Sequence, residues 1–179
     1  MKQIASMECL IFMIKDNMKK SIIIIIFLVS GFYTGAFAQN TYSFNEGLTA
    51  SKAANKITVL AIVSEQDTWS KKMEAVFSDG TNKNLLDNNF IFSKLDVDQK
   101  SIVTYNGKSY SPGDLAKVLG GTGYPTMVFF SPDGKIIRFR YNNEEVGFFA
   151  GYIEAADFGK MLNYFSSGNY KNTDLSKAF

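Results

Sequence analysis

The side chains best placed for chemistry follow a strongly apolar run. Ile57 to Val63 is almost continuously apolar and rich in β-branched residues, and the polar segment Ser64 to Ser70 comes directly after it. Its last four residues, Asp67-Thr68-Trp69-Ser70, offer a carboxylate, two hydroxyls and the only tryptophan of the chain. Aspartate is a favoured helix N-cap, so Asp67 is predicted to accept the backbone N–H of Ser70 at the start of a helix. A carboxylate that contacts a ligand is the other interpretation of Asp67.

The residue types present exclude several kinds of chemistry. The chain has no histidine, and its single cysteine is Cys9. No serine therefore has a histidine partner, which excludes a Ser-His-Asp hydrolase, and zinc binding is not expected. Asp96 and Asp98 point to one side of a predicted strand, but two carboxylates without further ligands make a poor calcium site. We therefore predict no metal and no cofactor.

The elements that would position these residues alternate between helices and strands. Helices are predicted at 44–55, 69–77, 82–88, 111–119 and 154–165, and strands at 57–63, 90–97, 126–130 and 136–141. Ser131-Pro132-Asp133-Gly134 is a strong turn signal, so the last two strands are predicted to form a hairpin, and Asn106-Gly107 indicates a further turn. This order predicts an α/β domain in which helices flank a central mixed sheet.

The order and several short stretches resemble the thioredoxin-like fold family. The stretches are Lys71-Lys72-Met73-Glu74 after the polar turn, Lys94-Leu95-Asp96-Val97-Asp98 at the end of a strand, and Tyr124-Pro125-Thr126 before another. They cover roughly residues 44–170 and look most like the exported SoxW-like and thioredoxin-2-like members. The resemblance implies a cis peptide bond before Pro125 and a groove in which the backbone of Tyr124 is offered to an extended peptide.

The chain departs from this family at the positions where the family performs its chemistry. The resemblance places a Cys-x-x-Cys motif where this chain has Asp67-Thr68-Trp69-Ser70. Thiol–disulfide exchange needs a thiolate that attacks sulfur, and neither a carboxylate nor a hydroxyl replaces it. We therefore expect no catalytic residue, with Asp67 and Ser70 as degenerate motif positions.

The resemblance also implies which residues would contact a partner. They are the residues of the polar turn and of the proline loop, namely Asp67, Thr68, Trp69, Ser70, Tyr124 and Pro125. For Trp69, contact with a partner at the lip of the groove competes with packing in the core, and the sequence leaves both open.

The N-terminal residues predict export. Met18-Lys19-Lys20 precedes the apolar segment 21–30 and then Ala36-Phe37-Ala38, a pattern typical of a signal peptide at 18–38 that is cleaved before Gln39. An uncleaved membrane anchor is the rival interpretation, although the strongly apolar core is short for a span. Residues 1–17 then form an upstream extension, consistent with a wrongly assigned start codon. The expected product is a single periplasmic or secreted domain at 39–179.

Removing the predicted signal peptide changes the charge and sulfur content. Of 19 basic and 17 acidic residues, four basic and two acidic ones precede Gln39, which leaves 15 of each. Residues 39–179 therefore carry no net charge, and we expect no nucleic acid partner and no membrane contact beyond the signal segment. They also lack cysteine, so the exported domain would depend on its core alone for stability.

Three functions are compatible with these observations. We expect a non-catalytic module that binds a peptide or a partner protein at the groove. A second possibility is a member of the thiol–disulfide oxidoreductase group whose activity is lost or supplied by the cysteines of a partner. A third is a structural accessory subunit with a vestigial groove. The sequence does not indicate an oligomeric state.

Overall fold

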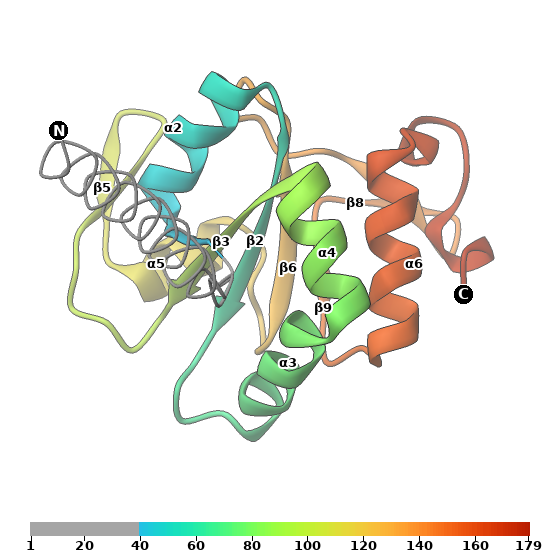
Figure 1. The fold of residues 1–179 in the computed structure, drawn as a ribbon. Coiled ribbons are helices and arrows are strands. Elements are labelled where there is room, and N and C mark those ends of the chain that lie inside the picture. Colours follow the sequence, from blue (N-terminus) through green and yellow to red (C-terminus); the bar gives the residue numbers. More distant parts are fainter. Residues whose placement is uncertain (1–39) are drawn as a thin grey trace, which may run out of the picture. The chain divides into compact units, whose positions relative to one another are not determined.

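A mixed five-stranded sheet forms the middle layer of the structure (Figure 1). The computed structural model describes residues 40–179, so the predicted upstream extension and signal peptide lie outside the described residues. The strand order is β1 (Thr41–Ser43), β3 (Phe90–Asp96), β2 (Ile57–Val63), β6 (Thr126–Phe130) and β9 (Phe149–Ala150). Strands β1, β3 and β2 are parallel, whereas β6 runs antiparallel to β2 and β9 antiparallel to β6. The predicted mixed sheet is confirmed.

Strand β2 lies at the centre of this sheet because its residues can be buried on both faces. Val59 and Ala61 belong to the core on one face, while Leu60 and Ile62 belong to the core on the other. This alternation follows from the two-residue period of a strand. The predicted strand 57–63 is confirmed with the same bounds.

Helices cover both faces of the sheet, as Figure 1 shows. One face is covered by α3 (Thr68–Ser78), α4 (Gly80–Asn89) and α6 (Ala155–Ser166), and the other by α2 (Phe44–Ala54) and α5 (Pro112–Val118). The five predicted helices are confirmed, with ends that differ by no more than two residues.

Aromatic side chains fill both cores. On the face of α3 and α6, the ring of Phe129 stacks on that of Phe165, with centroids 3.5 Å apart and planes at 12°. On the face of α2, the ring of Phe44 packs edge-on against Tyr105 and Phe130, each at 5.9 Å. A domain without cysteine thus has an aromatic-rich core on each side of the sheet.

Two short hairpins lie beside the central sheet. Strands β4 (Val103–Tyr105) and β5 (Lys108–Tyr110) pair across the predicted turn at Asn106-Gly107, where both residues have positive φ. Strands β7 (Phe139–Tyr141) and β8 (Glu144–Val146) pair across Asn142 and Asn143, which also have positive φ. Asparagine and glycine tolerate this backbone region better than other residues, so both turns suit tight hairpins.

The predicted hairpin between 126–130 and 136–141 forms only near its turn. Gly134 donates its N–H to the Ser131 carbonyl at 2.8 Å, and Ile136 bridges Phe130. Beyond Ile137 the chain leaves the central sheet, and β9 occupies the remaining edge of β6. The prediction of one continuous strand at 136–141 was wrong because 139–141 find a different partner in β8.

The C-terminal segment holds the β7–β8 hairpin. It contains the 3₁₀ turns η1 (Asn169–Lys171) and η2 (Leu175–Lys177), with Asp174 between them. The Asp174 carboxylate accepts the backbone N–H groups of Asn142 (3.1 Å) and Asn143 (2.7 Å). It also accepts the N–H (2.9 Å) and the hydroxyl (2.7 Å) of Ser176. These hydrogen bonds, to which the Ser176 hydroxyl contributes most, lower the pKa of Asp174 to about 2.

Within residues 40–179, every helix is too short or too polar to cross a lipid bilayer.

Candidate functional site

The turn between β2 and α3 places the predicted polar residues at one end of the sheet. The chain leaves β2 at Val63, and the Asp67 N–H donates to the Ser64 carbonyl at 3.2 Å. Helix α3 then begins at Thr68, with Asp67 as its N-cap, and the Asp67 Oδ2 accepts the N–H of Ser70 at 2.6 Å. The predicted capping hydrogen bond is confirmed, and it satisfies one of the backbone donors left open at a helix start.

Ser70 is held inside a network of hydrogen bonds. Its side chain is only 3% exposed, and its hydroxyl oxygen accepts the N–H of Ser64 at 3.2 Å. The Ser64 hydroxyl in turn donates to the Asp98 carboxylate at 2.7 Å and accepts the N–H of Gln66 at 3.2 Å. The serine is therefore part of the scaffold of the turn, and the chain has no histidine that could act as its base.

Ser64 and Asp98 were not predicted as partners. Asp98 was considered only as a calcium ligand together with Asp96, and the Asp96 carboxylate instead accepts the Asp98 N–H at 3.0 Å. Among residues 40–179 no three histidine, cysteine, aspartate or glutamate side chains come together as a metal would require. A serine followed by a distant Asp-x-Asp segment is too weak a signal to reveal this pair from the sequence.

The Tyr124–Pro125 loop lies at the same end of the sheet as the start of α3. Ile62, near the end of β2, pairs with Thr126, the first residue of β6, so the loop before β6 is next to the turn after β2. The Tyr124–Pro125 peptide bond is cis, as the resemblance implied. The Pro125 carbonyl accepts the N–H of Gly151 at 2.8 Å, and the Thr126 hydroxyl donates to the Gly123 carbonyl at 2.7 Å.

The backbone of Tyr124 is left open in this arrangement. No hydrogen bond joins its N–H or its carbonyl to another residue of the described part of the chain. Its side chain is half-buried against the core on the α2 face. The backbone groups that an extended segment would need are therefore present in the loop.

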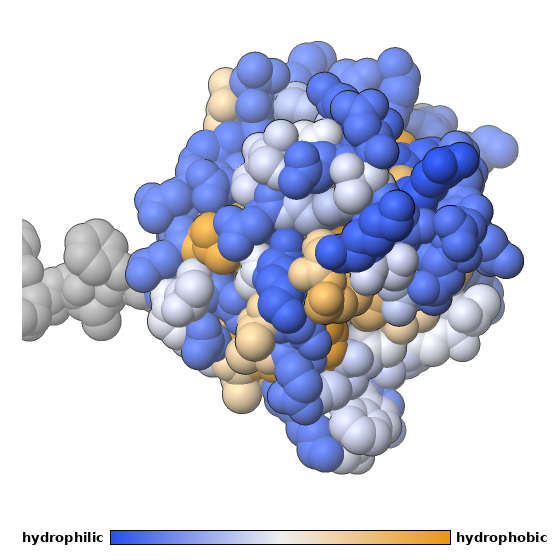
Figure 2. All heavy atoms as spheres, turned by 90° about the vertical axis from the view of Figure 1, so that its right-hand side faces the viewer, coloured by the Kyte–Doolittle hydropathy of each residue, from blue (hydrophilic) through white to orange (hydrophobic). Residues whose placement is uncertain are grey.

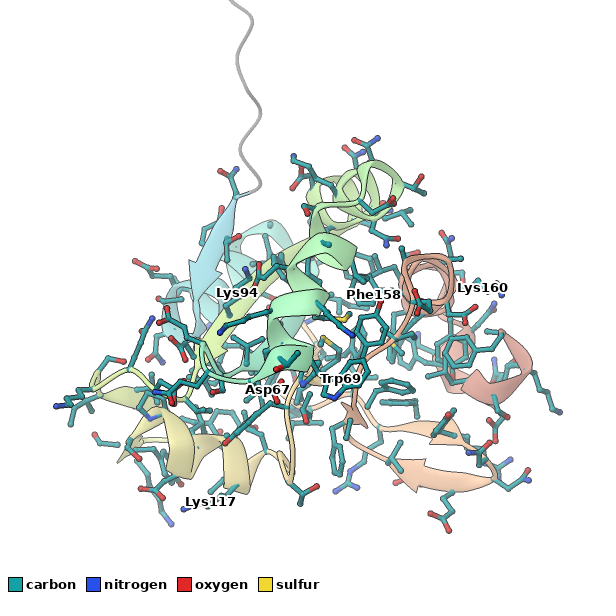
Figure 3. All side chains as sticks on the ribbon, turned by 90° about the horizontal axis from the view of Figure 1, so that it is seen from below. Asp67, Trp69, Lys94, Lys117, Phe158 and Lys160 are labelled. Atoms are coloured by element: carbon teal, nitrogen blue, oxygen red, sulfur yellow. The ribbon has the colours of Figure 1, made fainter. Side chains whose placement is uncertain are left out.

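Trp69 lies on the surface, so it does not pack in the core, and its contact with a partner stays a prediction. Its side chain is 49% exposed, and the ring centroid is 5.4 Å from that of Tyr152. The Lys72 Nζ lies 4.3 Å from the centroid of the tryptophan ring. Figure 3 shows Asp67 and Trp69 together at the start of α3. The exposed Thr68 lies between them in sequence, so the start of α3 presents both polar and aromatic groups to solvent.

Tyr152 is a residue of this site that the sequence did not reveal. It follows β9 by two residues, and its hydroxyl donates to the Glu154 carboxylate at 3.1 Å. Desolvation, together with that hydrogen bond, raises the pKa of the Tyr152 hydroxyl. Strand β9 is only two residues long, so no pattern in the sequence predicts that Tyr152 is brought to Trp69.

A cleft beside these residues lies on the other side of α3. It has a volume of about 500 Å³, and its lining is mostly charged: Val63, Ser64, Glu65, Ser70, Lys71, Glu74, Lys94, Asp96 and Gln99. Lys94 and Glu74 form an ion pair in it at 2.5 Å. Of the six predicted contact residues only Ser70 lines this cleft, and Lys94 and Trp69 lie on opposite sides of α3 (Figure 3). The predicted residues thus share one end of the sheet, and this cleft includes only one of them.

This fold matches a known family. The model of the thioredoxin-like domain matches residues 44–166, more than half of the chain. The protein belongs to the thioredoxin-like family. The comparison with curated proteins finds no match.

Solved structures agree with this assignment. A thioredoxin from Thermus thermophilus is 26% identical, with a TM-score of 0.50, over 70% of this chain and 85% of that one. A thioredoxin-fold protein from Helicobacter pylori is 16% identical, with a TM-score of 0.55, over 81% and 89%. An oxidoreductase named DsbH is 21% identical, with a TM-score of 0.51, over 75% and 88%. The latter two show the shared fold.

Proposed function

We propose that the protein is a redox-inactive thioredoxin-fold module that holds an extended peptide or partner segment where α3 begins beside the Tyr124–Pro125 loop. In this proposal Asp67 and Ser70 stand at the two cysteine positions of the family. The observation that carries it is the capping bond from Ser70 N–H to Asp67 at 2.6 Å, combined with a buried Ser70. Both side chains are engaged in scaffolding, and neither can attack a disulfide.

The binding half of the proposal rests on two neighbouring features. The unpaired backbone of Tyr124 offers one donor and one acceptor to an added extended segment. Trp69, packed against Tyr152, offers a large exposed apolar surface at the same end of the sheet. Tryptophan is among the residues that most often dominate binding energy at interfaces, so Trp69 is the expected anchor.

Export is part of the proposal. Residues 18–38 would act as a signal peptide, and the protein would reach the periplasm or the medium with Gln39 as its first residue. N-terminal sequencing of the protein recovered from the exported fraction tests this directly. If the first residue lies upstream of Ser21, the apolar segment is not cleaved and acts as a membrane anchor. If the precursor begins at Met1, the start codon is correctly assigned and residues 1–17 are part of the protein.

Binding is tested with an unfolded, cysteine-blocked probe. Reduced and carboxymethylated α-lactalbumin presents extended segments and cannot exchange disulfides. Trp69→Ala should weaken its binding by about tenfold or more. Phe179→Ala is the matched control, because Phe179 is also an exposed aromatic side chain (42%) but lies at the C-terminus. Binding that survives Trp69→Ala, Tyr124→Ala and Asp67→Ala alike would favour the accessory-subunit alternative.

Redox inactivity is tested with insulin reduction by dithiothreitol. Neither the protein that begins at Gln39 nor the uncleaved chain should accelerate the reaction over a blank, and the Cys9→Ser variant of the uncleaved chain should behave identically. Acceleration that persists in Cys9→Ser would overturn the first half of the proposal and leave the binding test unaffected. Acceleration only after a second, cysteine-bearing protein is added would support the alternative in which a partner supplies the thiols.

A further inference from the structure

The only two arginines of the sequence lie side by side on an exposed part of the surface. Arg138 and Arg140 are two residues apart, so their side chains leave the same face of the β7 segment. Phe139, between them, points the other way and is 2% exposed. Both arginines are exposed, and every other strongly basic residue of the chain is a lysine.

The two arginines line a cleft together with Lys171 of η1. The cleft has a volume of about 360 Å³, and its walls are Arg138, Phe139, Arg140, Glu145, Tyr170, Lys171, Asn172 and Thr173. Three cationic side chains thus share this cleft with a single carboxylate, that of Glu145. In residues 40–179 no carboxylate lies within 4.0 Å of the charged nitrogens of Arg138, Arg140 or Lys171. Glu145 pairs with Arg140 in the backbone register but not through its side chain.

The other carboxylate near the arginines, that of Asp174, already accepts hydrogen bonds from other residues. Asp174 forms a backbone bridge with Arg140, but its two oxygens accept four hydrogen bonds from Asn142, Asn143 and Ser176. Those bonds tie the hairpin that carries the arginines to the segment that carries Lys171. The cations are therefore held near one another before any ligand arrives, which lowers the cost of binding.

The arrangement fits a tetrahedral dianion. A guanidinium group is a planar fork that binds two oxygens of one phosphate, and charge-assisted hydrogen bonds of this kind are about twice as strong as neutral ones. The guanidinium groups of Arg138 and Arg140 and the ammonium group of Lys171 carry three positive charges, so they suit a ligand with two negative charges better than a ligand with one carboxylate. The cleft is larger than a phosphate group, and the Tyr170 ring, stacked on Phe165 at 5.6 Å, forms a wall for an organic substituent.

We propose that the cleft of Arg138, Arg140 and Lys171 binds the dianionic group of a phosphate monoester, either free or as a lipid headgroup. This site shares no residue with the candidate site at the start of α3, so it stands apart from the proposed function. The side of the molecule that carries α6 and the C-terminal segment is largely hydrophilic, and apolar side chains show there only between polar ones (Figure 2). That surface suits a charged ligand.

The test is an NMR titration of the ¹⁵N-labelled protein with inorganic phosphate and with glycerol 3-phosphate. The pH is held at about 7.5, above the second phosphate pKa of about 6, and chloride keeps the ionic strength constant. The expected result is a saturable shift of the amide signals of 138–145 and 170–173. Arg138→Gln and Arg140→Gln should each weaken binding by about tenfold, while Arg138→Lys with Arg140→Lys should weaken it by about threefold to tenfold because the forks are lost.

Control variants and lipid arms complete the test. Lys108→Gln removes an exposed charge from β5 and should leave the affinity unchanged. Vesicles that contain phosphatidic acid should be bound if the source is a lipid, whereas phosphatidylglycerol, a singly charged diester, should bind less. Binding to glycerol 3-phosphate but to neither vesicle assigns a free phosphate monoester.

Three outcomes would overturn the proposal. The first is no shift at these amides up to about 20 mM phosphate, a concentration that would reveal even a millimolar site. The second is an affinity unchanged when both arginines are glutamine. The third is tighter binding of a hexaglutamate peptide than of any phosphate monoester, which would assign the cleft to an acidic protein segment. Unchanged amide signals elsewhere in the variants verify that they are folded.

Discussion

Two aspartates fix the backbone of this protein, over very different distances along the chain. Asp67 accepts the N–H of Ser70, three residues away, within the first turn of α3. Asp174 accepts the N–H groups of Asn142 and Asn143, which lie 32 and 31 residues before it. Asp67 thus caps a helix locally, whereas Asp174 holds together two segments that are far apart in the sequence. The comparison teaches that a carboxylate can fix the start of one helix through a neighbour in sequence, or join two segments that are about 30 residues apart.

Removing the long-range aspartate should have the largest effect. Asp174→Ala leaves the Asn142–Asn143 turn and the Ser176 N–H without their acceptor, so we expect the unfolding temperature to fall by roughly 5 °C or more. Asp157→Ala is the matched control, because it removes an exposed aspartate of α6 that pairs only with Lys160. Differential scanning calorimetry measures both. Equal shifts for the two variants would show that the hydrogen bonds of Asp174 stabilise the fold no more than an exposed ion pair does.

The second prediction concerns acid. The pKa of Asp174 is about 2 in the folded protein, below the ordinary value of 3.8, so the carboxylate stabilises the fold at any pH above the unfolded pKa. Its contribution should diminish as the pH falls from about 4 to about 2, because unfolding takes up a proton in this interval. The measurement is the difference in unfolding temperature between the wild type and Asp174→Asn. That difference should be constant above about pH 5 and shrink below pH 4; a constant difference down to pH 2 would contradict the hydrogen-bonded carboxylate.

A smaller loss is expected at the local cap. Asp67→Ala removes the acceptor of the Ser70 N–H and should lower the free energy of unfolding by about 1 kcal/mol. Asp67→Ser keeps a capping oxygen and should recover most of this loss. Urea denaturation of the three proteins gives the values. If Asp67→Ala loses as much stability as Asp174→Ala, the long-range hydrogen bonds of Asp174 stabilise the fold no more than the local cap does.

The smallest change in stability is expected when the turn is given two thiols. Asp67→Cys combined with Ser70→Cys puts sulfur atoms across the first turn of α3, where we expect a disulfide to close under mild oxidation. Since the closed loop has only four residues, the oxidised form should be more stable than the reduced form by no more than about 2 kcal/mol, and the loss of the Asp67 cap should offset much of this gain relative to the wild type. Intact-mass spectrometry after alkylation counts the free thiols. Free thiols or covalent dimers alone would mean that Asp67 and Ser70 do not correspond to the two cysteine positions.

The features that the sequence predicted are those encoded by neighbouring residues. The β-branched run at 57–63 predicted both ends of β2 correctly. Asp67, as a favoured N-cap, predicted the start of α3 and its capping hydrogen bond. The cis bond before Pro125 was implied by the family resemblance and is present. For Trp69 the sequence left core packing and partner contact open, and the folded chain excludes core packing.

The features that were missed depend on residues far apart in the sequence. Strands β1 and β9 have three and two residues, too few for any alternation to appear. The turn Ser131-Pro132-Asp133-Gly134 was identified, but the partner of 139–141 was not, because the turn at Asn142-Asn143 and the Asp174 anchor together direct that strand to β8. Tyr152 reaches Trp69 only because β9 pairs with the start of β6.

The shortness of the two outer strands has a consequence for the protein in concentrated solution. A long exposed edge presents a row of unpaired N–H and carbonyl groups to which a strand of a second molecule can add, and such addition leads to fibrils. Here β1 offers three residues and β9 two, and the chain turns away into α2 and toward α6 directly after them. We therefore expect the folded domain to resist growth by sheet extension at either edge.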